Sequence, residues 1–121
     1  MKRFLAGLIV GLSLSGLSLL AQHLASEKVV EPQPIFENQK VKIHRWVLKP
    51  GEGTPPHTHT LDHISVILQG SLVKDMAEDG TSKTVEEKSG QVAYIPGTGR
   101  THSFANVGST TLESIAIEIK Q

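Results

Sequence analysis

Cysteine is absent from the 121-residue chain, which excludes disulfides, thiolate metal sites and a lipid-modified cysteine anchor. An excess of one charge is lacking as well, because basic and acidic side chains number 12 each. No stripe of lysine and arginine runs along the chain, so a nucleic-acid partner is not expected. A domain without disulfides must be held together by packing, with help from a metal ion where one binds.

Helical periodicity over three turns is missing from everything after the N-terminal segment, and no internal repeat occurs. Short apolar runs alternate instead with turns rich in glycine, proline and aspartate. The pattern predicts strands over 41–48, 57–59, 63–68, 71–76, 83–87, 91–95, 101–106 and 111–120. Alternation is clearest in the last, where Ile115, Ile117 and Ile119 share one face and Glu118 lies on the other. So many short strands predict an all-β sandwich or barrel.

The N-terminal segment, residues 1–25, has the composition of a signal peptide. Lys2 and Arg3 precede an uncharged stretch of 18 residues, Phe4–Ala21, that is rich in leucine, glycine and serine. We expect export, with cleavage between Ala21 and Ala25. The alternative is an uncleaved membrane anchor through residues 4–21, because the stretch is near the lower limit for a spanning helix. Both interpretations place the domain outside the cytoplasm, as a periplasmic or secreted protein or as a membrane-anchored one.

The remainder of the chain has the size of one domain of about a hundred residues. Residues 26–40 are expected to form a linker or an edge segment, since 31–38 carries two prolines. Residues 41–121 contain the predicted strands and therefore form the folded barrel.

Half of the six histidines lie in one stretch, Gly51–Gly70. His57 and His59 are two residues apart, so on a strand both point to the same face. His63 follows at the start of an apolar run. Three imidazoles this close can coordinate one metal ion, and His102 is the candidate for a fourth ligand.

These residues resemble the two sequence motifs of the cupin family. The first motif, G-x5-H-x-H-x3-4-E-x6-G, is matched in order by Gly51, His57, His59 and Gly70, with His63 at the glutamate position. The second, G-x5-P-x-G-x2-H-x3-N, is matched with one extra residue after the proline by Gly90, Pro96, Gly99, His102 and Asn106. Together the motifs cover more than half of the predicted domain.

The resemblance implies a double-stranded β-helix, a small jelly-roll barrel, with a metal ion inside it. Carried over by position, the metal ligands are His57, His59, His63 and His102. Histidine in place of the family's glutamate is similar to small single-domain members with four histidines. The resemblance also implies a homodimer that forms through edge strands.

Four neutral imidazoles suit one divalent transition metal ion (iron, manganese, copper, nickel or zinc) and argue against calcium and magnesium. A six-coordinate ion would keep two positions for water, substrate or dioxygen. Because the motif carboxylate is missing, proton transfer would need Tyr94, Asp62 or a metal-bound hydroxide. Tyr94 and Arg100 are the candidates for contact with a substrate. His23 and His44 are not expected to be ligands, and His44 is expected on the surface of its strand.

These features predict an exported, mononuclear metal-binding cupin. The favoured activity is that of a metal-dependent, dioxygenase-like enzyme acting on a small organic molecule. One alternative is a non-catalytic protein of the cell envelope that binds a metal or a small ligand. Another is a barrel in which the metal has only a structural role.

Overall fold

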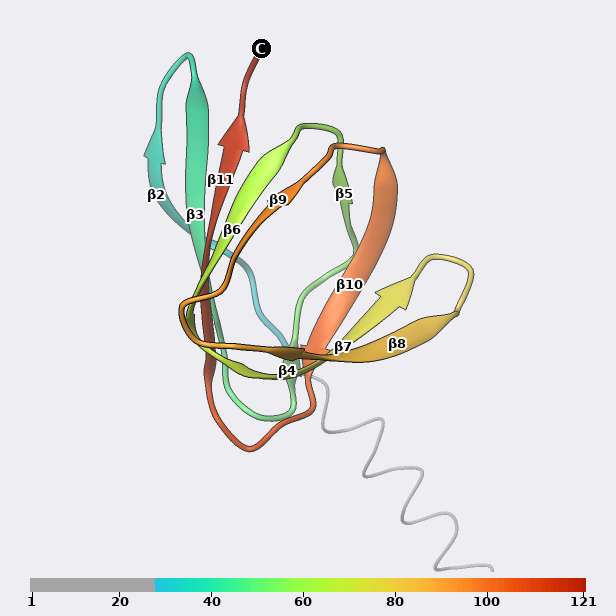
Figure 1. Ribbon diagram of the computed structural model, residues 1–121. Coiled ribbons are helices and arrows are strands. Elements are labelled where there is room, and N and C mark those ends of the chain that lie inside the picture. Colours follow the sequence, from blue (N-terminus) through green and yellow to red (C-terminus); the bar gives the residue numbers. More distant parts are fainter. Residues whose placement is uncertain (1–27) are drawn as a thin grey trace, which may run out of the picture.

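The computed structural model describes residues 28–121, which form two β-sheets facing each other (Figure 1). The predicted signal or anchor segment, 1–25, lies outside the described residues. Within 28–121 there is no helix, and hence none long and apolar enough to cross a membrane. The prediction of an all-β jelly-roll barrel is confirmed.

Six strands form one sheet in the order β1-β4-β10-β7-β8, with β5 paired to β10. Their bounds are β1 Lys28–Val29, β4 Glu52–Gly53, β5 His57–His59, β7 Ser71–Ala77, β8 Ser82–Glu87 and β10 Arg100–Asn106. The pairs are antiparallel except β1 with β4, which is parallel. Consecutive strands β4 and β5 both lie beside β10, so the stretch rich in histidine runs along one strand of the second motif.

Five strands form the other sheet in the order β2-β3-β11-β6-β9, and all of its pairs are antiparallel. Their bounds are β2 Gln33–Glu37, β3 Val41–Leu48, β6 His63–Gln69, β9 Val92–Ile95 and β11 Leu112–Ile119. The segment expected to be a linker or an edge contributes β2 at one edge of this sheet. The two-residue strands β1 and β4 were not predicted, because runs so short carry no periodicity.

Local turn chemistry explains the hairpin between β7 and β8. Gly80 has a positive φ of 89°, which glycine adopts without a steric penalty. The Asp79 carboxylate accepts hydrogen bonds from the Thr81 backbone amide at 3.0 Å and from its hydroxyl at 2.6 Å. The dipeptide Asp79-Gly80 therefore makes the turn that the sequence predicted.

The hydrophobic core lies between the sheets and is small. Leu48 and Leu112, from the five-stranded sheet, are almost completely buried and pack with Ile67 and Val73. Phe104 of β10 packs against this cluster. The core fills one end of the space between the sheets, and the histidines lie beyond it.

Candidate metal centre

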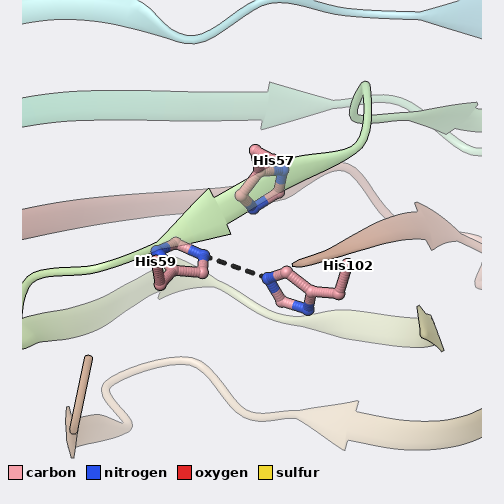
Figure 2. A group of neighbouring side chains, drawn as sticks. All are labelled: His57, His59 and His102. Atoms are coloured by element: carbon pink, nitrogen blue, oxygen red, sulfur yellow. Dashed lines mark hydrogen bonds between the residues drawn. The ribbon is translucent and has the colours of Figure 1, made fainter. Parts of the chain in front are cut away.

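Three imidazole rings gather between the sheets. His57 and His59 lie on β5, and His102 of β10 is paired directly with His57, so all three point to the same side. One nitrogen from each ring lies within 4.8 Å of the other two. His59 Nε2 and His102 Nε2 are 3.0 Å apart. Figure 2 draws this contact as a dashed line between the two rings. Strand pairing therefore brings the H-x-H of the first motif to the histidine of the second.

Hydrogen bonds on the far side of two rings determine which nitrogen is free to bind. His57 Nδ1 lies 2.9 Å from the Pro55 carbonyl oxygen, which can only accept, so Nδ1 donates its hydrogen there. Its Nε2 is buried and has no hydrogen-bond partner. His102 Nδ1 lies 3.0 Å from Asp75 Oδ1 and donates to the carboxylate in the same way. The unprotonated Nε2 atoms of both rings are therefore directed into the cluster.

This arrangement fits a transition metal ion. Ligand nitrogens about 2.1 Å from an ion and at right angles to each other are about 3.0 Å apart. His59 Nε2 and His102 Nε2 have this separation. The Nε2 of His57, which has no hydrogen-bond partner within residues 28–121, supplies a third donor. We conclude that His57, His59 and His102 can hold one ion.

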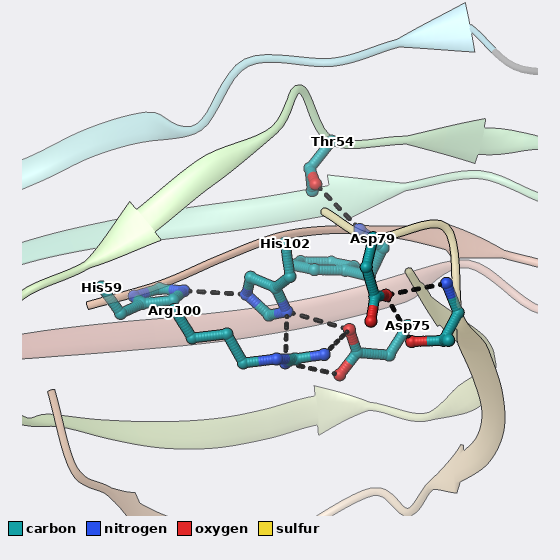
Figure 3. Close-up of polar contacts among 8 residues, drawn as sticks. Thr54, His59, Asp75, Asp79, Arg100 and His102 are labelled. Atoms are coloured by element: carbon teal, nitrogen blue, oxygen red, sulfur yellow. Dashed lines mark hydrogen bonds and ion pairs between the residues drawn. The ribbon is translucent and has the colours of Figure 1, made fainter. Parts of the chain in front are cut away.

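Asp75 and Arg100 support the His102 ring from behind (Figure 3). The Arg100 guanidinium binds both carboxylate oxygens of Asp75, at 3.1 and 3.2 Å. Burial opposes ionisation of Asp75, but the hydrogen bonds from Arg100 and His102 outweigh it, so its pKa lies below the ordinary value. The ionised carboxylate fixes the His102 ring with Nε2 toward the cluster.

Replacing Asp75 with asparagine is expected to weaken Co²⁺ binding by roughly 10–100-fold, the usual cost of losing such a supporting group. The amide can no longer accept the His102 hydrogen as a charged partner. Competition with a chromophoric chelator measures the affinity. Asp79→Asn is the matched control, because Asp79 bonds only to Thr81 in its own turn. Equal affinities for wild type and Asp75→Asn would contradict a supporting role.

His63 lies against the cluster in a different orientation. Its ring stacks on His59, with centroids 4.4 Å apart and planes 22° from parallel. Its Nδ1 is buried and has no hydrogen-bond partner, although it does not belong to the group within 4.8 Å. The predicted set of four ligands is thus brought together as three convergent rings and one stacked ring, and ligation by His63 stays a prediction.

Burial favours the neutral form of His59, His63 and His102. It lowers the pKa of His59 to about 4, with help from the charges of His63 and His57. Burial also lowers the pKa values of His44, His63 and His102, opposed by Glu118 at the first two and by Asp75 at the third. Neutral imidazole is the form that binds a metal, so the unprotonated site is ready at neutral pH.

The metal-free protein is expected to lose stability as the pH falls from about 6.5 toward 4. An unfolded histidine takes up a proton near pH 6.5, whereas folded His59 does so only near pH 4. Between these values the unfolded state binds more protons, so unfolding becomes easier as the pH falls. Urea titrations at several pH values measure the effect. His59→Gln should show a shallower dependence, and an identical one would contradict the assignment.

Residues of the cluster line two hollows. A cavity of about 160 Å³ between the sheets is lined by His57, His59, His63 and His102 and by mostly apolar walls, including Trp46 and Phe104. An outer groove of about 740 Å³ lies between β2, β3 and the β5 segment. Trp46, His57 and His59 line both. A molecule in the groove can therefore reach the histidines without crossing the core.

Several sequence-predicted residues take other positions. Tyr94 is 59 % exposed and its hydroxyl donates to Asp62, so the structure does not bring these two to the histidines. Arg100 lies close to the histidines, but its guanidinium forms an ion pair with Asp75. The expectation that His44 lies on the surface is wrong. Its side chain is half-buried, lines the groove and lies against Trp46, because both residues point inward from β3.

Two carboxylates near the site were missed by sequence reasoning. Asp75 lies two residues after Val73 on β7, so both side chains point inward. This two-residue spacing from an apolar core residue could have identified it. Glu118 is paired in register with His63 and lines the groove. Alternation placed it on the face opposite Ile117 and Ile119 without saying which face is inside, and in the structure the face of Glu118 points inward.

Comparison with known proteins relates the chain to the cupins. The family model of the cupin domain matches residues 44–118. A cupin domain from Bordetella pertussis Tohama I is 27% identical, with a TM-score of 0.68 over 75% of this chain and 93% of that one. An RmlC-like cupin family protein from Methanocaldococcus jannaschii is 21% identical, with a TM-score of 0.61 over 74% and 79%. The polyketide cyclase RemF from Streptomyces resistomycificus is 22% identical, with a TM-score of 0.52 over 69% and 57%. No curated protein matches the chain.

Proposed function

The chain belongs to the cupin domain family, and from this premise we propose that it is a mononuclear metal-dependent enzyme of the oxygenase type. The observation that carries the proposal is the convergence of three imidazoles at the wall of a mostly apolar cavity, where two of them also line an outer groove. A site that only stabilised the fold would need no space beside the ion.

The donor set determines which ions suit the site. Imidazoles favour iron, manganese, copper, nickel and zinc over calcium and magnesium. A bound transition metal would supply Lewis-acid activation and, for a redox-active ion, one-electron chemistry with dioxygen. The protein contributes three oriented rings, the supporting carboxylate of Asp75, and walls that exclude water.

The substrate is a small and mainly apolar organic molecule. The cavity walls are formed largely by Trp46, Phe104, Ile67, Val73 and Leu112. At about 160 Å³ the cavity is smaller than sites for drug-sized ligands, which run from about 300 Å³. The substrate would occupy both the cavity and the groove, with its reacting part beside His57 and His59, which line both.

Glu118 is the carboxylate best placed to exchange a proton with a substrate in the groove. It lies opposite His63, the residue that replaces the motif glutamate, and its charge raises the pKa values of His63 and His44 against the effect of burial. Asp75 is already bound to Arg100 and His102, and Glu87 accepts a hydrogen bond from Gln91. Tyr94 and Asp62 bond to each other away from both hollows.

A second candidate function is a non-catalytic protein of the cell envelope that binds a metal or small ligand. The replacement of the motif glutamate by His63 favours it, because a proton acceptor beside the metal is lost. In both cases we propose that the protein works outside the cytoplasm, exported or anchored through residues 4–21, on the strength of the basic start and uncharged stretch.

Two measurements on the full-length protein test the proposal. Azide added to the Co²⁺-loaded protein should change the visible spectrum, because an open coordination position accepts the anion. An unchanged spectrum would indicate a structural metal. The Fe²⁺-loaded protein should then consume dioxygen when a small-molecule extract is added, and Glu118→Gln should slow that consumption. Azide binding without any dioxygen consumption would favour the non-catalytic function.

A further inference from the structure

Two buried polar side chains with an unpaired polar group lie at the same cavity. Residues 28–121 bury five polar side chains: Thr54, His63, Ser71, Asn106 and Ser114. Thr54, Ser71 and Asn106 are each hydrogen-bonded to another residue. Within the same described range, His63 Nδ1 has no partner and the Ser114 hydroxyl forms no hydrogen bond, although these residues are only 6 % and 7 % exposed. Both line the cavity between the sheets, and burying an unpaired polar group is unfavourable, so the two groups indicate a ligand that supplies the partner.

Ser65 provides a second hydroxyl beside that of Ser114. The two serines lie on neighbouring strands, β6 and β11, with Ser65 opposite Ala116 and Ser114 opposite Ile67. They are therefore diagonal neighbours on the inward face, a relation in which Cα atoms are about 7–8 Å apart and Cβ atoms somewhat closer. Both serines line the cavity. Two hydroxyls at this spacing can reach the same polar group of a bound molecule.

The two hydroxyls lie across the cavity from the metal centre. β6 and β11 belong to the five-stranded sheet, whereas β5 and β10, which carry His57 and His102, belong to the sheet that faces it (Figure 1). Ala116 lies between the two serines on this wall, and its small side chain leaves room for a ligand to lie against them. A molecule bound to Ser65 and Ser114 would therefore extend toward the histidines.

The charges around the cavity favour a ligand group that is polar but neutral. The acidic residues that line it are Asp75 and Glu87, and within residues 28–121 no lysine or arginine lines it. The Arg100 guanidinium is bound to both carboxylate oxygens of Asp75. A ligand carboxylate at the serines would be buried among like charges without a cation, which is unfavourable. A hydroxyl or carbonyl group avoids this penalty and can bond to serine, which both donates and accepts.

We propose that Ser65 and Ser114 determine substrate specificity by binding a neutral hydroxyl or carbonyl group of the substrate. The substrate class is then an alcohol, phenol or ketone with an apolar body that fits between Trp46 and Phe104. This inference rests on the proposed function, because the serines orient the same molecule that reacts at the histidines. An analogue without the polar group would leave the hydroxyls unpaired and would bind less tightly.

Titration calorimetry of the full-length, Co²⁺-loaded protein with phenol and toluene tests the proposal. The two probes share one ring and differ in a hydroxyl or a methyl group, and a protein cavity of about 150 Å³ accepts such a ring. Wild type should bind phenol about 10-fold more tightly than toluene. Ser114→Ala and Ser65→Ala should each reduce this preference to about two-fold or less, and toluene affinity should stay within a few-fold of wild type. Ser103→Ala is the matched control and should keep the preference, because Ser103 lies between the inward-facing His102 and Phe104 and points outward.

Three results would overturn the proposal. One is equal affinity for phenol and toluene, or no binding of either, in wild type. Another is a preference for phenol that both serine variants retain, which would mean that the hydroxyl binds at the histidines or the metal.

The third is a loss of stability in Ser114→Ala. Urea denaturation should show this variant to be at least as stable as wild type, because its hydroxyl has no partner to lose within residues 28–121. The same titrations on the metal-free protein separate this inference from the proposed function. A preference for phenol that depends on the serines would persist there even if azide and dioxygen gave no response in the metal-loaded protein.

Discussion

Replacing His102 with alanine is expected to lower the affinity for Co²⁺ by more than about 100-fold, since even a supporting group that does not touch the ion is worth 10–100-fold. His102 supplies one of the three converging nitrogens, 3.0 Å from His59 Nε2. It is also the candidate ligand that links β10 to the histidines of β5. Isothermal titration calorimetry and the visible spectrum of bound Co²⁺ measure the loss.

Two further variants are needed to interpret the loss of Co²⁺ affinity in His102→Ala. His44→Ala is the control, because His44 is half-buried near the cluster and lies outside the converging group. It should keep an affinity within a few-fold of wild type. His63→Ala decides between three and four ligands: a loss as large as that of His102→Ala would establish ligation by His63. Unchanged binding in His102→Ala would contradict the proposed centre.

Replacing Asn106 with leucine is expected to destabilise the protein by about 2–6 kcal/mol, because the two buried groups among its four partners, on Ser71 and Leu48, would each cost about 1–3 kcal/mol when unsatisfied. The Asn106 side chain is almost fully buried. Its Oδ1 accepts from the Ser71 hydroxyl at 2.7 Å and the Gly108 amide at 3.0 Å. Its Nδ2 donates to the carbonyls of Leu48 and Thr110, at 2.9 and 2.8 Å.

Urea denaturation followed by circular dichroism measures this change. Asn38→Leu is the matched control, since Asn38 is exposed and caps the turn before β3 by accepting from the amides of Lys40 and Val41. Water can replace those bonds, so its cost should be about 1 kcal/mol or less. A loss in Asn106→Leu as small as that in Asn38→Leu would show that the buried network does not hold the strands together.

Asn106 also shows that one motif contains both candidate metal ligands and residues that stabilise the fold. The second motif ends four residues after His102, and the structure shows that its last position joins β3, β7 and the turn before β11. Gly70, the last position of the first motif, is also required by the fold and not by the metal site. A Cβ there would lie 2.1 Å from the Glu87 carbonyl oxygen, so the backbones can approach only at glycine. Motif spacing alone could not separate these residues from the ligands.

The sequence by itself determined the strands, the turns and the approximate site, because period-two alternation and turn residues are local properties of the chain. The predicted run 41–48 is β3, and 57–59 is β5. A strand places alternate residues on one face, so the sequence put His57 and His59 together, and the resemblance to the cupin motifs implied that His102 joins them, as it does in the structure.

Only the tertiary structure decided which face of each strand points inward. Alternation marks two faces but does not say which one is inside, and in β11 the isoleucines point outward while Ser114, Ala116 and Glu118 point toward the cavity and groove. The inward orientation of these strand faces also places Asp75 beside His102 and stacks the His63 ring on His59. Such contacts depend on how distant strands pair and how the sheets curve, which no window of neighbouring residues contains.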